Sequence, residues 1–169
     1  MFKKIELKLF DIDVTKLKGI PVLDQVTFKE YRILNRPYLM QYLSTRVKFH
    51  VTPDIINITE IESPGAGPHI DAWPVALNYY LNAGQDVTNF WEEIDESAIT
   101  ASNTFTLFQD AANLKLKSVA TYNTGDCILL NTHSIHSIGV TADAQPRSML
   151  RFSWKNAQYD EILNSIELL

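Results

Sequence analysis

The sequence predicts a mainly β fold, a sandwich or jelly roll of short strands with a few flanking helices. From Val47 onward, runs rich in β-branched and aromatic residues alternate with clusters of turn-forming residues. The chain has 169 residues, of which 46% are hydrophobic, which is enough to fill one core. No repeat or linker divides the chain. We therefore expect one domain over residues 1–169, with its core over 47–154.

The first third of the chain mixes two kinds of pattern. Residues 5–10 alternate polar and apolar side chains, which indicates a strand, whereas residues 28–43 place apolar side chains at spacings that a helix would show. Val47 to Val51 alternate again, and residues 55–61 are rich in isoleucine and threonine. We expect a helix followed by two strands here.

A breaker cluster, residues 63–68, separates this part from the rest of the core. It contains two glycines and two prolines, which predicts a tight loop or one that a ligand approaches. The apolar run 74–81 then indicates a buried strand, and the tail 159–169 has the spacing of a short capping helix. Further strands are expected at 104–108, 118–122, 127–130, 135–140 and 147–154.

Charge and cysteine content exclude several classes of function. The 15 Lys and Arg against 20 Asp and Glu give a net charge of −5 with no dense basic block, so we expect no nucleic-acid partner. The single cysteine, Cys127, excludes an internal disulfide and a cysteine-cluster metal site, as suits a reducing, cytoplasmic location. No export signal and no apolar run of roughly 20 residues is present, so we expect no membrane association.

Three residues form a candidate metal site. His69 and Asp71 are separated by one residue, so on an extended backbone their side chains leave the same face. His136, which follows an apolar strand and a turn, is the candidate third ligand, with His133 as an alternative. Two histidines and one carboxylate leave coordination positions open, as in non-haem Fe(II) oxygenases, although such ligands also accept other divalent metals.

The segments around these residues resemble the Fe(II)/2-oxoglutarate-dependent dioxygenase superfamily. The resemblance covers residues 55–154 and rests on Pro68-His69-Ile70-Asp71 with Ala76–Asn82, and on Gly125-Asp126, His136-Ser137-Ile138 and Pro146-Arg147-Ser148. It is nearest to small hydroxylases of the prolyl or aspartyl/asparaginyl type. It implies a double-stranded β-helix, a jelly-roll or cupin-like barrel, in which His69, Asp71 and His136 hold Fe(II). The implied activity is hydroxylation of a small molecule, an amino acid or a peptide side chain, with 2-oxoglutarate and dioxygen as co-substrates.

The far carboxylate of 2-oxoglutarate needs a fixed cation, and arginine offers a planar fork that binds a carboxylate with two hydrogen bonds. Arg147 follows His136 by 11 positions and matches the basic residue of the superfamily pattern. Arg151 competes for this role because the two arginines share a strand face. Asn78 and Tyr80 also share a face, and we expect them to hydrogen-bond the co-substrate.

Two other functions remain open for this sequence. A cupin-type metalloprotein would use the same barrel and metal for another reaction. A non-catalytic jelly-roll binding module would use the histidines structurally and meet a partner through its acidic surface.

Overall fold

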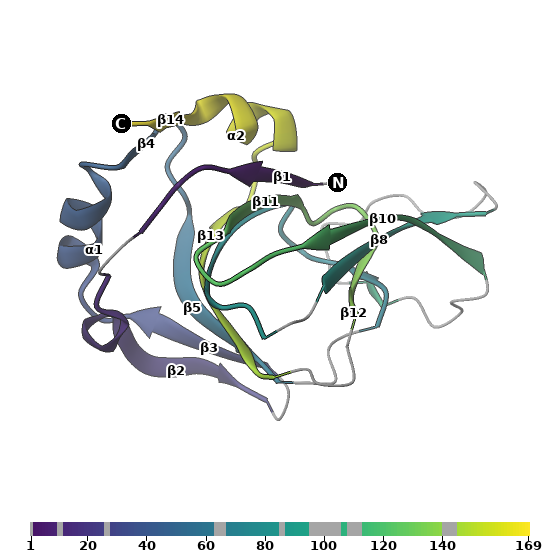
Figure 1. Cartoon of the computed structure of the whole chain (residues 1–169), viewed down its shortest axis with the longest axis horizontal. Coiled ribbons are helices and arrows are strands. Elements are labelled where there is room, and N and C mark those ends of the chain that lie inside the picture. Colours follow the sequence, from purple (N-terminus) through teal and green to yellow (C-terminus); the bar gives the residue numbers. More distant parts are fainter. Residues whose placement is uncertain are drawn as a thin grey trace.

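The computed structural model of the protein describes residues 2–9, 12–25, 28–62, 67–84, 87–94, 106–107, 113–139 and 145–169. Two antiparallel sheets form its main body (Figure 1). Within the described residues, the larger sheet has the strand order β1 (Phe2–Ile5), β11 (Cys127–Asn131), β7 (Val75–Asn82), β13 (Arg147–Trp154), β5 (Ile55–Ile61), β3 (Phe28–Ile33) and β2 (Lys18–Asp24). The smaller sheet has the order β10 (Leu114–Thr121), β8 (Val87–Glu93), β12 (His136–Gly139), β6 (His69–Ile70) and β9 (Thr106–Leu107).

Between β5 and β13 the chain passes repeatedly from one sheet to the other. Strands β5, β7, β11 and β13 belong to the larger sheet, and β6, β8, β10 and β12 belong to the smaller one. Eight strands shared between two sheets in this way form a jelly roll, also called a double-stranded β-helix. The mainly β, jelly-roll fold expected from the sequence is therefore confirmed.

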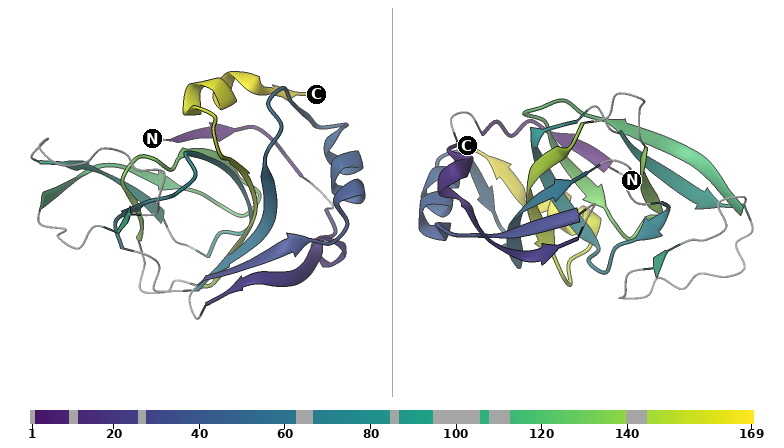
Figure 2. Two further views of the ribbon diagram at one scale, coloured as in Figure 1. Left: turned by 180° about the vertical axis from the view of Figure 1, so that it is seen from behind. Right: turned by 90° about the horizontal axis from the view of Figure 1, so that it is seen from below.

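The remaining elements lie outside the larger sheet. They are the short 3-10 helix η1 (Val14–Lys16), α1 (Arg36–Leu43), α2 (Tyr159–Ser165), and a two-stranded sheet of β4 (Val47–Phe49) and β14 (Ile166–Leu168). Figures 1 and 2 show α1 and α2 on the convex side of the larger sheet. Among the described residues, no helix has the length and apolar character needed to cross a membrane.

The larger sheet separates two clusters of buried side chains, because successive residues of a strand point to opposite faces. The outer cluster lies between the sheet and the helices and includes Leu77, Phe152, Trp154 and Ile162. The inner cluster lies between the two sheets and includes Ile61, Tyr80, Phe90, Tyr122, Ile128, Leu130 and Met149. The site described below opens on the inner cluster.

The two expectations for the N-terminal part were wrong in position or type. The first strand is Phe2–Ile5 and not residues 5–10. Leu7 and Leu9 are nevertheless buried in the outer cluster, so the alternation there reflects burial without strand pairing. Residues 28–43 divide into strand β3 and helix α1, because the Asn35 side chain accepts a hydrogen bond from the Tyr38 backbone N–H and starts the helix there.

Strands β5 and β13 have the bounds that the sequence predicted, and β4, β7, β10, β11 and β12 lie within a few residues of theirs. Of the expected strand 104–108, only residues 106–107 are described, and they form β9; likewise, residues 63–66 of the breaker loop lie outside the described residues. The C-terminal helix ends at Ser165, and β14 follows it. Strands β2, β6 and β8 were not predicted.

Candidate metal centre

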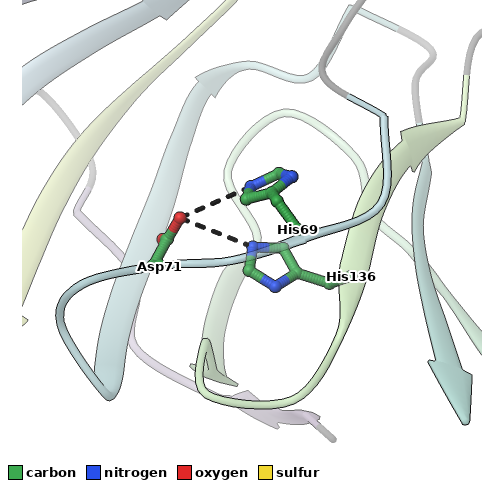
Figure 3. Close-up of side chains that lie close together, drawn as sticks. All are labelled: His69, Asp71 and His136. Atoms are coloured by element: carbon green, nitrogen blue, oxygen red, sulfur yellow. Dashed lines mark ion pairs between the residues drawn. The ribbon is translucent and has the colours of Figure 1, made fainter. Parts of the chain in front are cut away.

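The three predicted ligands come together at the mouth of the jelly roll. His69 begins β6, Asp71 follows that strand, and His136 begins β12 directly opposite His69 in the register. The two imidazole rings lie 4.3 Å apart between centroids. The ligand atoms of the three side chains all lie within 4.8 Å of one another (Figure 3). The fold therefore brings side chains from two distant segments of the sequence around one point.

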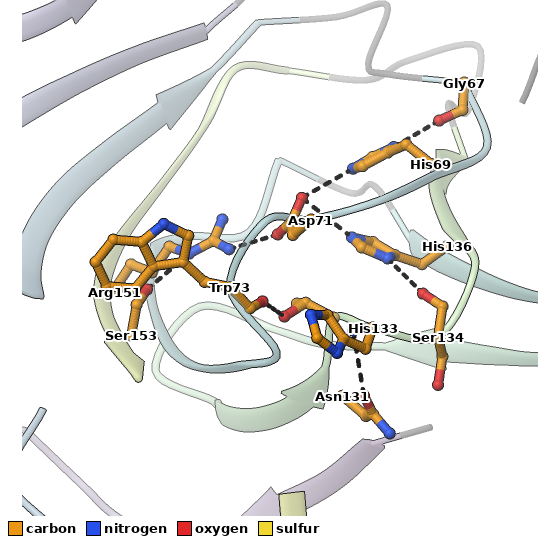
Figure 4. Close-up of polar contacts among 11 residues, drawn as sticks. Gly67, His69, Asp71, Trp73, Asn131, His133, Ser134, His136, Arg151 and Ser153 are labelled. Carbon is orange, nitrogen blue, oxygen red and sulfur yellow. Dashed lines mark hydrogen bonds and ion pairs between the residues drawn. The ribbon is translucent and has the colours of Figure 1, made fainter. Parts of the chain in front are cut away.

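Hydrogen bonds fix the orientation of both imidazoles. Nδ1 of His69 donates to the carbonyl oxygen of Gly67 at 2.7 Å, and Nδ1 of His136 donates to that of Ser134 at 2.9 Å (Figure 4). A carbonyl oxygen only accepts, so each Nδ1 carries a proton and each Nε2 is the nitrogen left to bind a metal. Both Nε2 atoms face Asp71 Oδ1, at 3.4 Å from His69 and 3.9 Å from His136.

The charges at this point favour a bound cation. Burial lowers the pKa of His136 to about 4, so this ring is neutral at pH 7. Burial alone would raise the pKa of Asp71, but the Arg151 guanidinium and the two imidazoles hold it well below its usual range. Two imidazole Nε2 atoms and one carboxylate oxygen thus converge, a donor set that suits Fe(II) and related divalent metals. The residues present fit a metal ion.

Asp71 is itself anchored from two sides. Its backbone N–H donates to the carbonyl oxygen of Thr132 at 3.0 Å. Its Oδ2 accepts a hydrogen bond from Arg151 Nη2 at 2.6 Å, and the two side chains are 18% and 16% exposed. The sequence did not predict this contact, because it indicated Arg151 only as an alternative to Arg147 for binding the co-substrate.

A cavity of about 460 Å³ extends from the three ligands into the space between the sheets. Arg147, Arg151, Asn78 and Tyr80 all contribute to its wall. Apolar side chains complete much of the lining, among them Leu23, Phe28, Ile61, Leu130, Ile138 and Met149. The candidate metal site and all four predicted co-substrate residues therefore share one cavity.

Arg147 is buried in this cavity with part of its hydrogen-bonding capacity unused. It is 5% exposed, and its Nη1 donates to the Tyr122 hydroxyl. Its Nε has no hydrogen-bond partner among the described residues, although buried polar groups normally have one. An unpartnered cationic donor next to a cavity is suited to receive an anionic ligand.

Asn78 and Tyr80 lie on the inner face of β7. Asn78 Oδ1 is buried without a hydrogen-bond partner among the described residues. Tyr80 stacks on Tyr122 at 3.9 Å between ring centroids, and burial raises the pKa of Tyr80 above its ordinary value. The phenol therefore stays protonated. The sequence missed Tyr122, because a tyrosine that follows a strand carries no signal for this role.

His133, the alternative third ligand, lies outside the cluster. It lines a separate cavity of about 300 Å³ with Pro74 and the start of α2, and its backbone N–H donates to the Asn131 side chain. Cys127 is fully buried in the outer cluster. Among the described residues, His69, Asp71 and His136 are the group of histidine and carboxylate side chains placed to share a metal ion.

No protein-family model and no curated protein matches the chain. Among solved structures, vicilin from Capsicum annuum is similar, with a TM-score of 0.42, 14% identity, and coverage of 83% of this chain and 32% of that one. For E. coli ycfD the TM-score is 0.43 with 13% identity, and the match covers 78% of this chain and 31% of that one. For Lactobacillus farciminis oxalate decarboxylase in its formate complex the TM-score is 0.40 with 14% identity, and the match covers 89% of this chain and 33% of that one. The chain spans about a third of the length of these proteins.

Proposed function

We propose that this protein is a non-haem Fe(II)- and 2-oxoglutarate-dependent oxygenase that hydroxylates a small molecule, an amino acid or a peptide side chain. The observation that carries the proposal is the shared cavity, which has the His69–Asp71–His136 cluster and the buried, partly unpartnered Arg147 in its wall. A metal alone would suit many reactions. A metal together with a buried cation in one cavity suits a co-substrate that is a metal-binding keto acid with a second carboxylate.

The metal ligands and Arg147 have separate roles in the proposed reaction. His69, Asp71 and His136 hold the metal through one atom each, which leaves positions open for other ligands. When bound, Fe(II) supplies the site at which dioxygen and the keto acid meet and the redox chemistry that converts a C–H bond to an alcohol. Arg147 binds the far carboxylate of 2-oxoglutarate, and the Tyr122 hydroxyl fixes the orientation of the guanidinium.

Arg147 is a better anchor than Arg151, because Arg151 already donates to Asp71 at 2.6 Å. Asn78 and Tyr80 supply further polar contacts from the adjacent strand. The apolar wall of the cavity, including Ile61, Leu130 and Met149, excludes water from the bound co-substrate, which strengthens its polar contacts.

Anaerobic visible absorption tests this proposal. The purified protein is mixed with Fe(II), with and without 2-oxoglutarate, and the wild type is compared with His69→Ala and Arg147→Ala. We expect a weak band that requires both the metal and the keto acid. It should be absent in His69→Ala, and in Arg147→Ala it should require about 10- to 100-fold more keto acid, as for loss of one charged contact. Arg32→Ala, at an exposed position of β3, is the matched control.

The outcomes separate the three candidate functions. A folded protein that binds Fe(II) but shows no keto-acid-dependent band would contradict the proposal and support a cupin-type metalloprotein of another activity. A folded protein that binds no divalent metal would support a non-catalytic binding module.

A further inference from the structure

The two oxygens of Asp71 face different partners. Oδ1 faces Nε2 of His69 and of His136, whereas Oδ2 accepts from Arg151 Nη2 at 2.6 Å. We propose that Arg151 is a positioning residue that restricts Asp71 to a single metal-binding oxygen and so keeps one more coordination position open. This inference rests on the metal part of the proposed function and not on the keto acid.

Arg151 is well placed to hold one carboxylate oxygen. It lies in the interior of β13, which pairs with β5 on one side and β7 on the other, opposite Asn57 and Asn78. Its Nε donates to the Ser153 hydroxyl at 3.3 Å, so both ends of the guanidinium have an acceptor. A strand in the middle of a sheet gives this side chain a rigid base.

Asp71 is fixed at its other end. Its backbone N–H donates to the Thr132 carbonyl oxygen, just beyond the end of β6. With the backbone held there and Oδ2 held by Arg151, a rotation that brings both oxygens toward the imidazoles would break a charge-assisted hydrogen bond, one of the stronger polar contacts in proteins. Figure 4 shows Asp71 between Arg151 on one side and the two imidazoles on the other.

Whether Asp71 binds through one oxygen or two decides how many positions on the metal exchangeable ligands can occupy. Carboxylates bind metals through one oxygen or through both. In a six-coordinate site, three protein atoms leave three positions, and a second Asp71 oxygen would reduce them to two. The proposed reaction needs three, two for the keto acid and one for dioxygen. The two arginines of β13 therefore have different roles: Arg147 binds the co-substrate, and Arg151 positions the metal ligand Asp71.

The test counts metal-bound water with Mn(II) as the probe. Water proton relaxation is measured on Mn(II)-saturated wild type, Arg151→Met, Arg151→Lys and the control Arg32→Met. Arg151→Met keeps a long side chain without donors, so about a third of the inner-sphere relaxation should be lost as three waters become two. Arg151→Lys should restore most of the loss, because an ammonium group can also donate to Oδ2. Arg32→Met should match the wild type.

Ser153→Ala is a milder second variant, which removes the acceptor of Arg151 Nε and should give a smaller loss in the same direction. Unchanged relaxation per bound Mn(II) in both Arg151→Met and Ser153→Ala, or in whichever of them folds, would overturn the inference, as would a wild type that binds no Mn(II). A general loss of stability does not change the water count of a bound ion. Failure of 2-oxoglutarate to displace water from the wild type would contradict the oxygenase but not the role of Arg151.

Discussion

The two faces of strand β13 differ sharply in what they contribute. On the outer face, Leu150, Phe152 and Trp154 are almost fully buried in the apolar cluster beneath the helices. On the inner face, Arg147 and Arg151 flank Met149 in the wall of the cavity. A strand places alternate residues on opposite faces. The same segment can therefore contribute apolar packing on its outer face and polar groups to the cavity on its inner face.

Among the described residues of the larger sheet, the same contrast appears in which buried polar atoms lack a hydrogen-bond partner. Thr59 Oγ1, Asn78 Oδ1 and Arg147 Nε are buried without hydrogen-bond partners among the described residues, and all three belong to strands of the larger sheet. Their strand positions alternate with those of the outer cluster, which places them on the inner face. Asn78 and Arg147 line the cavity, so a bound ligand can relieve the cost of their unpartnered atoms.

The largest effect on stability is expected from the outer face. Phe152 is 0% exposed and packs against Phe49 at 5.4 Å between ring centroids. Phe152→Ala should lower the free energy of unfolding by about 3–5 kcal/mol, because it removes a large side chain and leaves a cavity. Urea denaturation measures the loss, and Mn(II) affinity of the folded variant should stay within about threefold.

Met149→Ala is the matched variant on the inner face of the same strand, where Met149 is 1% exposed. It should lower the free energy of unfolding by about 2–4 kcal/mol. It should also change Mn(II) binding, since Met149 lines the cavity. Equal weakening of Mn(II) binding by both variants would show that the two faces are coupled.

Two glycines with positive φ extend the comparison to the turns. Gly84 has φ of 66°, and an added Cβ would lie 2.3 Å from the Gln145 carbonyl oxygen, beside Arg147. Gly125 has φ of 87°, and its added Cβ would meet only the Tyr79 hydroxyl, at 3.8 Å. Gly84→Ala should cost about 2–3 kcal/mol from strain and crowding together, and Gly125→Ala about 1 kcal/mol from strain alone. Thermal unfolding compares them; equal losses would show that crowding at Gly84 is relieved by local movement.

A smaller, pH-dependent effect is expected at the edge of the larger sheet. Asp126 accepts a hydrogen bond from the Asn123 backbone N–H at 2.9 Å and pairs with Lys4 of β1 at 2.8 Å. Burial alone would raise the pKa of Asp126, but these partners lower it below its ordinary value of 3.8. A lowered carboxyl pKa stabilises the folded state above pH 3.8, and that stabilisation is lost as pH falls through the folded-state pKa.

Asp126→Asn should therefore cost about 1 kcal/mol at pH 7, and the difference from the wild type should shrink steadily below pH 3.8. Urea denaturation at several pH values measures it. In a Lys4→Met background, the substitution should have a smaller effect, because the pair is already broken. A pH-independent difference would mean that the loss comes from the turn and not from the charge.

The elements that the sequence predicted best are those whose two faces follow the hydrophobic pattern. Strand β5 is one example, with Ile56 and Ile58 facing the outer cluster. Strand β8 was missed because both of its faces mix polar and apolar residues: Thr88 and Phe90 face inward, and Asn89 and Trp91 face the other way. A polar lining removes the alternation by which a strand is recognised.

The site was predictable where local spacing decides geometry. The His69-x-Asp71 spacing puts both side chains on one face, and the resemblance supplied His136. The sequence did not reveal which same-face arginine meets Asp71, because this depends on where the chain after β6 crosses β13. Tyr122 and Thr132 likewise contribute through contacts that only the folded chain brings together.

The smallest expected effect on stability most directly tests the contrast between the faces. Asn78→Leu removes the unpartnered Oδ1 from the inner face, so the free energy of unfolding should stay within about 1 kcal/mol or rise. The affinity for 2-oxoglutarate should fall about 5- to 10-fold through the loss of one hydrogen bond. Thr59→Val is the matched control, because Thr59 Oγ1 is also buried and unpartnered but Thr59 does not line the cavity. It should leave keto-acid affinity unchanged; a strong loss of stability in Asn78→Leu would instead make Asn78 a structural residue of the barrel.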